Sequence, residues 1–162
     1  MRSRRRLAVV PVLLLALVAC SDDTSAPEDD ASFPPITGEG RGGSELPAPE
    51  DQAAALESSG AVVEVFSGAL AEGETGSGQV ADVAAGTQLL RVVCTSQDGA
   101  PVTVTVTAGD DEVTSYPAPC APVFQGGATM SDSDAFDVPG GALDVTVTAN
   151  TGSVAAVGLI AG

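Results

Sequence analysis

Two segments of the chain alternate strictly between apolar and polar residues. In 102–107 valine alternates with threonine, and in 142–149 leucine and valine alternate with aspartate and threonine. Successive side chains of a β-strand point to opposite faces of its sheet. Each segment therefore predicts a strand with one buried face and one solvated face.

Other segments are apolar almost throughout. The runs 89–93 and 154–160 are typical of central strands that are covered on both faces. Turns rich in Gly, Asp, Pro and Asn separate the segments. The expected strands are 61–67, 79–84, 88–96, 101–108, 112–116, 135–138, 142–149 and 153–161. The pattern predicts an all-β fold, a single antiparallel β-sandwich of about eight strands over residues 56–162.

Two segments carry a resemblance to known folds. In 81–86 and 136–141 a short alternating strand and a glycine turn lead into a valine-rich strand. This rhythm resembles that of secreted jelly-roll modules, of which the pre-peptidase C-terminal type is one. The resemblance implies the fold alone, because such folds host unrelated functions.

The N-terminal segment has a different pattern. Four arginines within 2–6 precede an apolar run from Leu7 to Ala19. A membrane-spanning helix needs about 20 apolar residues, so this run is too short to span and predicts a signal peptide at 1–19. An ordinary cleaved signal with an incidental cysteine, or an uncleaved anchor, is the alternative.

The end of this run resembles the lipobox of bacterial lipoproteins. The residues that match it are Leu17, Val18, Ala19 and Cys20. The resemblance implies transfer of diacylglycerol to the Cys20 thiol, cleavage before Cys20 and fatty acylation of the new N-terminus. It places the protein at the cell membrane, lipid-anchored and facing the extracytoplasmic side.

The segment 20–55 is expected to be a disordered acidic linker. Its low hydrophobicity, acidic residues and prolines cannot offset the entropy of ordering. A short helix at 50–57, directly after Pro49, fits the pattern but is too short to be stable alone.

The charge of the chain limits its partners. From Cys20 onward two arginines stand against 22 acidic side chains, which leaves a charge of −20. Nucleic acid and anionic lipid surfaces would repel such a protein. The expected membrane contact is therefore made through the lipid anchor alone, and a protein or envelope partner stays unidentified.

Two cysteines remain once Cys20 is assigned to the anchor. In an exported protein Cys94 and Cys120 are expected to form a disulfide. The bridge would close a loop of roughly 25 residues and stabilise the fold by about 3–4 kcal/mol on the chain-entropy model. Two buried thiols are the alternative.

Most catalytic constellations are excluded by composition. The chain has no histidine and no lysine, which excludes Ser-His-Asp and Cys-His sites, histidine-bearing zinc sites and Schiff-base lysines. The glycine-rich segment 73–78 is interpreted as a turn between strands. We expect no enzymatic activity, with a hydrolase that uses carboxylates alone as the remote alternative.

Two ligand classes stay open. No cofactor is expected, but Asp132, Asp134 and Asp137 are weak candidates for calcium, with 110–112 as a second acidic turn. Solvated acidic turns explain both segments with nothing added, and we favour that interpretation.

Carbohydrate binding usually needs an exposed aromatic platform. In the sandwich domain Tyr116 is the candidate, because Phe66, Phe124 and Phe136 are expected in the core. The favoured function is therefore a non-catalytic, lipid-anchored envelope protein that displays a disulfide-clamped β-sandwich in a binding or accessory role. A calcium- or carbohydrate-binding module is the alternative.

Overall fold

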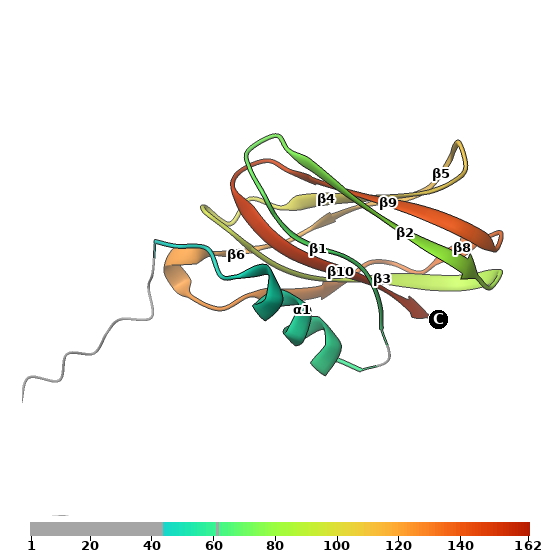
Figure 1. Ribbon diagram of the computed structural model, residues 1–162, viewed down its shortest axis with the longest axis horizontal. Coiled ribbons are helices and arrows are strands. Elements are labelled where there is room, and N and C mark those ends of the chain that lie inside the picture. The colour runs from blue at the N-terminus through green and yellow to red at the C-terminus, as the bar shows by residue number, and fades with distance from the viewer. Residues whose placement is uncertain (1–43, 61) are drawn as a thin grey trace, which may run out of the picture. The chain divides into compact units, whose positions relative to one another are not determined.

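The structure, a computed structural model, describes residues 44–60 and 62–162, which form two β-sheets packed face to face (Figure 1). The strands are β1 Val63–Leu70, β2 Thr75–Val83, β3 Gly86–Ser96, β4 Val102–Ala108, β5 Asp111–Ala118, β6 Ala121–Pro122, β7 Thr129–Asp132, β8 Phe136–Val138, β9 Gly141–Ala149 and β10 Ser153–Ala161. One sheet has the order β1-β10-β3, and the short strands β6, β7 and β8 pair with the other edge of β3. The second sheet has the order β2-β9-β4-β5. The all-β sandwich expected from the sequence is confirmed.

The alternating segments behave as predicted. On β4 the valines at 102, 104 and 106 are fully buried, and the threonines between them are half-buried on the outer face. On β9, Leu143, Val145 and Val147 are likewise fully buried. These two strands pair antiparallel, so their apolar rows lie side by side and form the inner surface of the second sheet.

The central strands β3 and β10 are covered on both faces. Leu90, Val92 and Val157 point into the core between the sheets. The outer face carries Val93 and Ala156, which pack against Leu56. The continuous apolar runs in these strands therefore reflect two packing surfaces.

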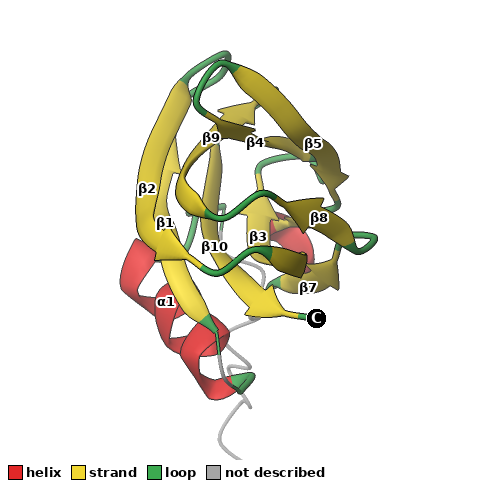
Figure 2. Ribbon diagram, turned by 90° about the vertical axis from the view of Figure 1, so that its right-hand side faces the viewer, coloured by secondary structure: helices red, strands yellow, loops and turns green. Residues whose placement is uncertain are grey.

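The outer cover is helix α1, Pro49–Ser58 (Figure 2). Residues 49–55, which the sequence placed in the linker, thus belong to the folded unit. The helix is short and weakly amphipathic, but Leu56 and Gln52 are buried against the sheet. Tertiary packing supplies the stability that an isolated helix of this length lacks.

Cys94 and Cys120 form a disulfide, as expected. Their Cα atoms lie 4.6 Å apart, and 26 positions separate them in sequence. The bridge ties the C-terminal part of β3 to the segment between β5 and β6. It thereby joins the first sheet to the segment that follows β5 of the second sheet.

The interpretation of 73–78 as a turn is wrong in its second half, because β2 begins at Thr75. The glycines of this segment serve packing between the sheets. A side chain at Gly78 would collide with the backbone of Val65 on β1, and one at Gly76 with the ring of Phe66. Glycine therefore lets β1 and β2 approach closely at the side of the sandwich.

Two further strands, β6 and β7, were not expected. Both are short segments that pair with β3, and neither carries a periodic apolar pattern. No helix among the described residues is long and apolar enough to cross a membrane.

Candidate functional site

The residues assigned to the anchor lie outside the described residues. They are Leu17, Val18, Ala19 and Cys20. The prediction that they form a lipidation site stays a prediction.

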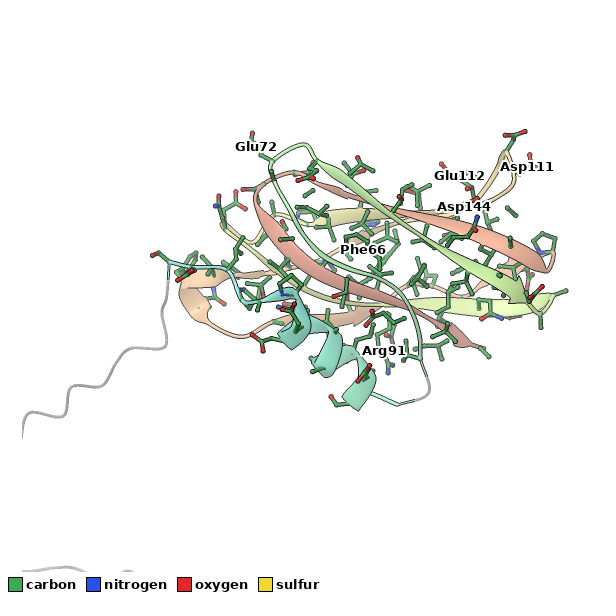
Figure 3. All side chains as sticks on the ribbon, in the orientation of Figure 1. Phe66, Glu72, Arg91, Asp111, Glu112 and Asp144 are labelled. Carbon is green, nitrogen blue, oxygen red and sulfur yellow. A yellow bond between two sulfur atoms is a disulfide. The ribbon has the colours of Figure 1, made fainter. Side chains whose placement is uncertain are left out.

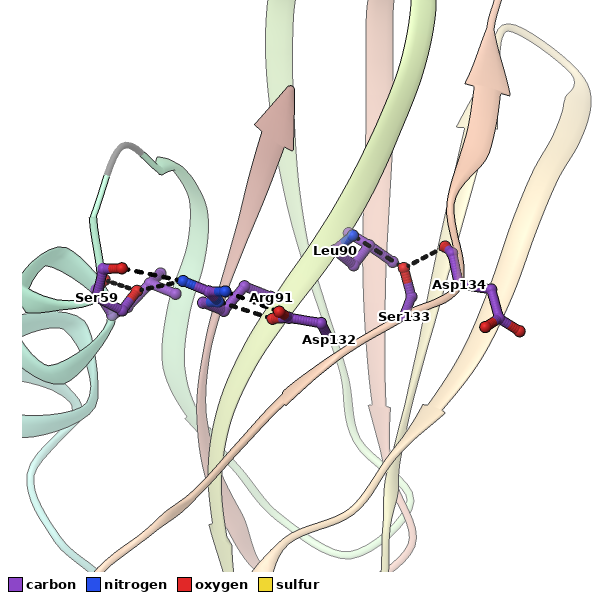
Figure 4. A network of polar contacts seen from close by, with 7 residues as sticks. Ser59, Leu90, Arg91, Asp132, Ser133 and Asp134 are labelled. Carbon is purple, nitrogen blue, oxygen red and sulfur yellow. Dashed lines mark hydrogen bonds and ion pairs between the residues drawn. The ribbon is translucent and has the colours of Figure 1, made fainter. Parts of the chain in front are cut away.

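Asp132, the first calcium candidate, is held by a cation. Its carboxylate accepts two hydrogen bonds from Arg91, Nε to Oδ1 and Nη2 to Oδ2, each 2.7 Å long (Figure 4). The hydrogen bonds from Arg91 lower the pKa of Asp132 below its usual value, against a smaller opposing effect of burial. The pKa of Arg91 is raised by the same contact.

Arg91 also reaches helix α1. Its Nη1 donates to the backbone oxygen of Ser59 at 3.0 Å and to the Ser59 hydroxyl at 3.2 Å. Arg91 thus joins the end of α1, the middle of β3 and the end of β7 (Figure 4). This is a structural clamp between elements.

The other two calcium candidates have different surroundings. Asp137 accepts a hydrogen bond from the Thr87 hydroxyl at 2.9 Å, whereas Asp134 is exposed. Ser133, which lies between Asp132 and Asp134, is buried, and its hydroxyl accepts from the Leu90 amide and donates to the Asp134 carbonyl (Figure 4).

The acidic turns do not gather into a cation site in the described part of the chain. No three potential metal ligands lie together within residues 44–60 and 62–162. Asp111 and Glu112 project from the tip of the β4–β5 hairpin (Figure 3). The structure leaves these carboxylates apart from one another.

Two aromatic residues, Phe124 and Tyr116, are placed differently from the prediction. Phe66 and Phe136 are partly buried and pack on the core, as does Tyr116. Phe124 lies on the 3-10 turn Val123–Gln125 and is 64% exposed. The expectation that Phe124 belongs to the core is wrong, because its turn follows β6 at the rim of the first sheet.

The described part of the chain has a cleft of about 520 Å³. It opens where the start of β1, the end of β2 and the end of β10 meet, beside the start of β3. Its lining residues are Val62, Val63, Val80, Ala81, Asp82, Val83, Ala84, Gln88, Leu159 and Ala161. We call this hollow the inter-sheet cleft.

An irregular stretch at the end of β2 lines the inter-sheet cleft. The pairing of β2 with β9 is irregular between Val80 and Val83. Asp82 in this bulge has a φ of 57°, the single positive value among the described non-glycine residues. A bulge of this kind bends its strand locally, and the ladder resumes where Val83 pairs with Gly141.

The polar residue of the cleft floor is Gln88, which is 8% exposed. It shares the inner face of β3 with Leu90, Val92 and Cys94. Among the described residues no group hydrogen-bonds to its side-chain amide. The sequence could have indicated Gln88, because it is a polar residue at an alternate position of a strand whose inner face is otherwise apolar. No feature of the sequence indicates the backbone conformation of Asp82.

A second hollow of about 290 Å³ lies between α1 and residues 127–128. Gln52 on its wall donates from Nε2 to the Thr95 hydroxyl at 3.0 Å, which in turn donates to the Gly127 carbonyl at 2.8 Å. The Oε1 atom of Gln52 is buried without a partner among the described residues. This chain of hydrogen bonds fixes the helix to the sheet.

The comparisons with known proteins were made for families, curated proteins and solved structures. No family model matches the sequence, and no curated protein matches it. Solved structures match as well, and two of them are carbohydrate-binding modules. One is a carbohydrate-binding module, CBM6cm-2, from Cellvibrio mixtus lichenase 5A in complex with cellotriose, at 13% identity over 71% of this chain and 95% of that chain, with a TM-score of 0.44.

The other is the CBM36-1 domain of a multidomain xylanase from the hindgut metagenome of Trinervitermes trinervoides. It has 10% identity over 63% of this chain and 97% of that chain, with a TM-score of 0.43. Similarities of this degree assign no ligand to the present protein. What the structure itself shows is a disulfide-bearing β-sandwich.

Proposed function

We propose that this protein is a non-catalytic, lipid-anchored component of the cell envelope that displays its β-sandwich on the extracytoplasmic side. The observation that carries the proposal is the order of a basic start, a short apolar run and the tetrad ending in Cys20. The disulfide between Cys94 and Cys120 supports it, because disulfides persist in oxidising compartments outside the cytoplasm.

The anchor has a simple physical basis. A single acyl chain binds a bilayer only marginally, at about 0.8 kcal/mol per buried methylene, so stable attachment needs two chains or signals. A diacylglyceryl group on the Cys20 sulfur supplies two chains on one residue. The acidic chain that follows is repelled by anionic headgroups, which favours holding the sandwich clear of the membrane.

The lipid anchor is tested by detergent phase partitioning of the full chain expressed in a bacterium. We expect the native protein in the detergent phase and Cys20→Ala in the aqueous phase or unprocessed. Ser21→Ala is the matched control, because it changes the neighbouring residue and leaves the thiol. Detergent partitioning of Cys20→Ala equal to that of the native protein would refute the anchor.

The absence of catalysis is supported by the chemistry of the carboxylates. A general acid near neutral pH needs a raised pKa, whereas Arg91 lowers the pKa of Asp132. Asp132 is thereby kept as the acceptor in an ion pair. The chain has no histidine and no lysine, so proton transfer would have to use its carboxylates or its tyrosine.

Carbohydrate binding is the second candidate function, and the exposure of Phe124 favours it. An aromatic ring that is 64% exposed offers its flat face for stacking, and burial of such a ring contributes to binding. Phe124 replaces Tyr116 as the platform candidate, because Tyr116 packs on the core.

This candidate is tested by affinity electrophoresis of the full chain in gels that contain xylan, mixed-linkage β-glucan or hydroxyethyl cellulose. Binding through Phe124 predicts retardation in at least one gel, which Phe124→Ala abolishes. Met130→Ala is the control, because Met130 is also an exposed apolar side chain. Unchanged mobility of the native chain in all three gels rejects carbohydrate binding to these polysaccharides.

A further inference from the structure

The inter-sheet cleft has the size and lining of a small-molecule site. Binding sites for small ligands typically measure about 300–1,000 Å³ and are mostly apolar with a few polar groups. The cleft measures about 520 Å³ and is walled mainly by valine, alanine and leucine side chains. Val63 at its rim is 57% exposed, so a ligand in the cleft would bury apolar surface that now faces solvent.

The floor of the cleft carries a hydrogen-bonding group without a protein partner. Gln88 is 8% exposed and lines the cleft, and no described residue bonds to its amide. The amide atoms of Gln88 are reached by solvent, since they are not among the buried unpaired atoms of the described residues. Its donor and acceptor are therefore available to a ligand that fills the cleft.

The mouth of the cleft carries a negative charge on a strained residue. Asp82 has a φ of 57°, a region that residues other than glycine rarely adopt, with aspartate and asparagine tolerated best. Strain of this kind is found often at ligand sites. Asp82 lines the cleft and has no cation partner in the described part of the chain, where the one ion pair joins Arg91 to Asp132.

Charge also decides which ligands can approach. The chain carries a formal charge of −16 at pH 7, and this field repels anions and attracts cations. A carboxylate at the mouth of an apolar cleft adds a local preference for a positive head group.

We propose that the inter-sheet cleft binds a small cationic amphiphile. Its apolar body fills the space between Val80, Val83 and Leu159, its ammonium group pairs with Asp82, and Gln88 takes up a hydrogen bond from a polar group of the ligand. This binding activity goes beyond the lipid anchor and the carbohydrate candidate, and it depends on neither.

The test uses three probes of equal chain length, octylammonium, octan-1-ol and octanoate, on the full chain carrying Cys20→Ser so that no bound lipid competes. Binding is followed by the NMR shifts of the methyl groups of Val80, Val83 and Leu159. We expect saturable shifts, with octylammonium binding more tightly than octanol and octanoate binding most weakly. Transferred or intermolecular NOEs from the octyl chain to these methyl groups locate the probe.

The variant Asp82→Asn separates charge from shape, because asparagine also tolerates the positive φ. It should weaken octylammonium binding about threefold, as expected for a partly solvated ion pair, and leave octanol binding unchanged. Raising the salt concentration should reduce the preference for the cation in the native chain only.

The variant Ala84→Trp fills the cleft and should abolish binding of all three probes. Ala71→Trp is the matched control, because Ala71 is exposed and follows the opposite end of β1. If Ala84→Trp fails to fold, the NOEs still decide where the probe lies. Absence of saturable shifts and NOEs at the cleft methyl groups would overturn the proposal. Octanoate binding as tight as octylammonium binding, or octylammonium binding unaffected by Asp82→Asn, would do so as well.

Discussion

At the scale of single residues, Arg91 is the hub of the polar contacts on the outer face of the first sheet. It holds Asp132 through two hydrogen bonds and the end of α1 through Ser59. Arg91 is 21% exposed and Asp132 is 41% exposed. Water therefore screens the pair, and its contribution to the free energy of unfolding is at most about 1 kcal/mol.

The pair makes part of the stability dependent on pH. Because the pKa of Asp132 is lowered in the folded protein, its contribution is present above the ordinary aspartate pKa of about 3.9. It is lost as the pH falls from there through the lower pKa of the folded state. Arg91 stays protonated throughout this window and adds no pH dependence of its own.

We therefore expect Asp132→Asn to lower the free energy of unfolding by up to about 1 kcal/mol at pH 7 and by less at pH 3. Urea unfolding of the oxidised protein at both pH values measures the difference. Asp134→Asn is the control, because Asp134 is exposed, and its effect should stay within about 0.5 kcal/mol. An equal loss for Asp132→Asn at both pH values would contradict the ion-pair account.

At the scale of elements, the strands with strict alternation were predictable, whereas the helix packing was not. The valines of β4 and the apolar row of β9 determine which face of each strand is buried, because a shift of the pairing by one residue would expose all of these side chains. Helix α1 has no comparable pattern, and its place depends on the outer faces of β3 and β10. Gly158 on β10 shows this dependence, since a side chain there would collide with Val62 and crowd Leu56.

The packing of α1 is tested at Leu56, which is fully buried. Leu56→Ala should lower the free energy of unfolding by about 2–4 kcal/mol, because it removes buried methyl groups and leaves a cavity. Glu57→Ala on the exposed side of the helix should change it by less than about 0.5 kcal/mol. A loss below about 1 kcal/mol for Leu56→Ala would show that the helix contributes little to the fold.

The candidate sites were harder to predict than the strands. Phe124 belongs to a short turn whose exposure depends on the packing of β6 and β7, which pair with β3 without a periodic pattern of their own. Asp82 belongs to the proposed cleft site because of its backbone conformation, a positive φ. Aspartate tolerates this conformation, but the sequence alone does not predict it. Gln88 alone carried a sequence signal, as a polar residue on an otherwise apolar inner face.

At the scale of the whole molecule, we propose a protein with a lipidated cysteine, an acidic chain and a disulfide-clamped sandwich. The disulfide closes a loop within the sandwich and is compatible with an oxidising compartment. The sandwich offers an apolar cleft with a negative mouth and an exposed phenylalanine on its surface. We propose that these features serve binding at the envelope.

The central claim concerns the Cys20 sulfur, and the most direct measurement is the mass of the N-terminal tryptic peptide of protein purified from envelopes. Trypsin should cut after Arg41, since no basic residue lies between Cys20 and Arg41. The account predicts a peptide of residues 20–41 that carries a diacylglyceryl group on Cys20. A peptide that begins at another residue, or one that carries an unmodified Cys20 thiol, would contradict it.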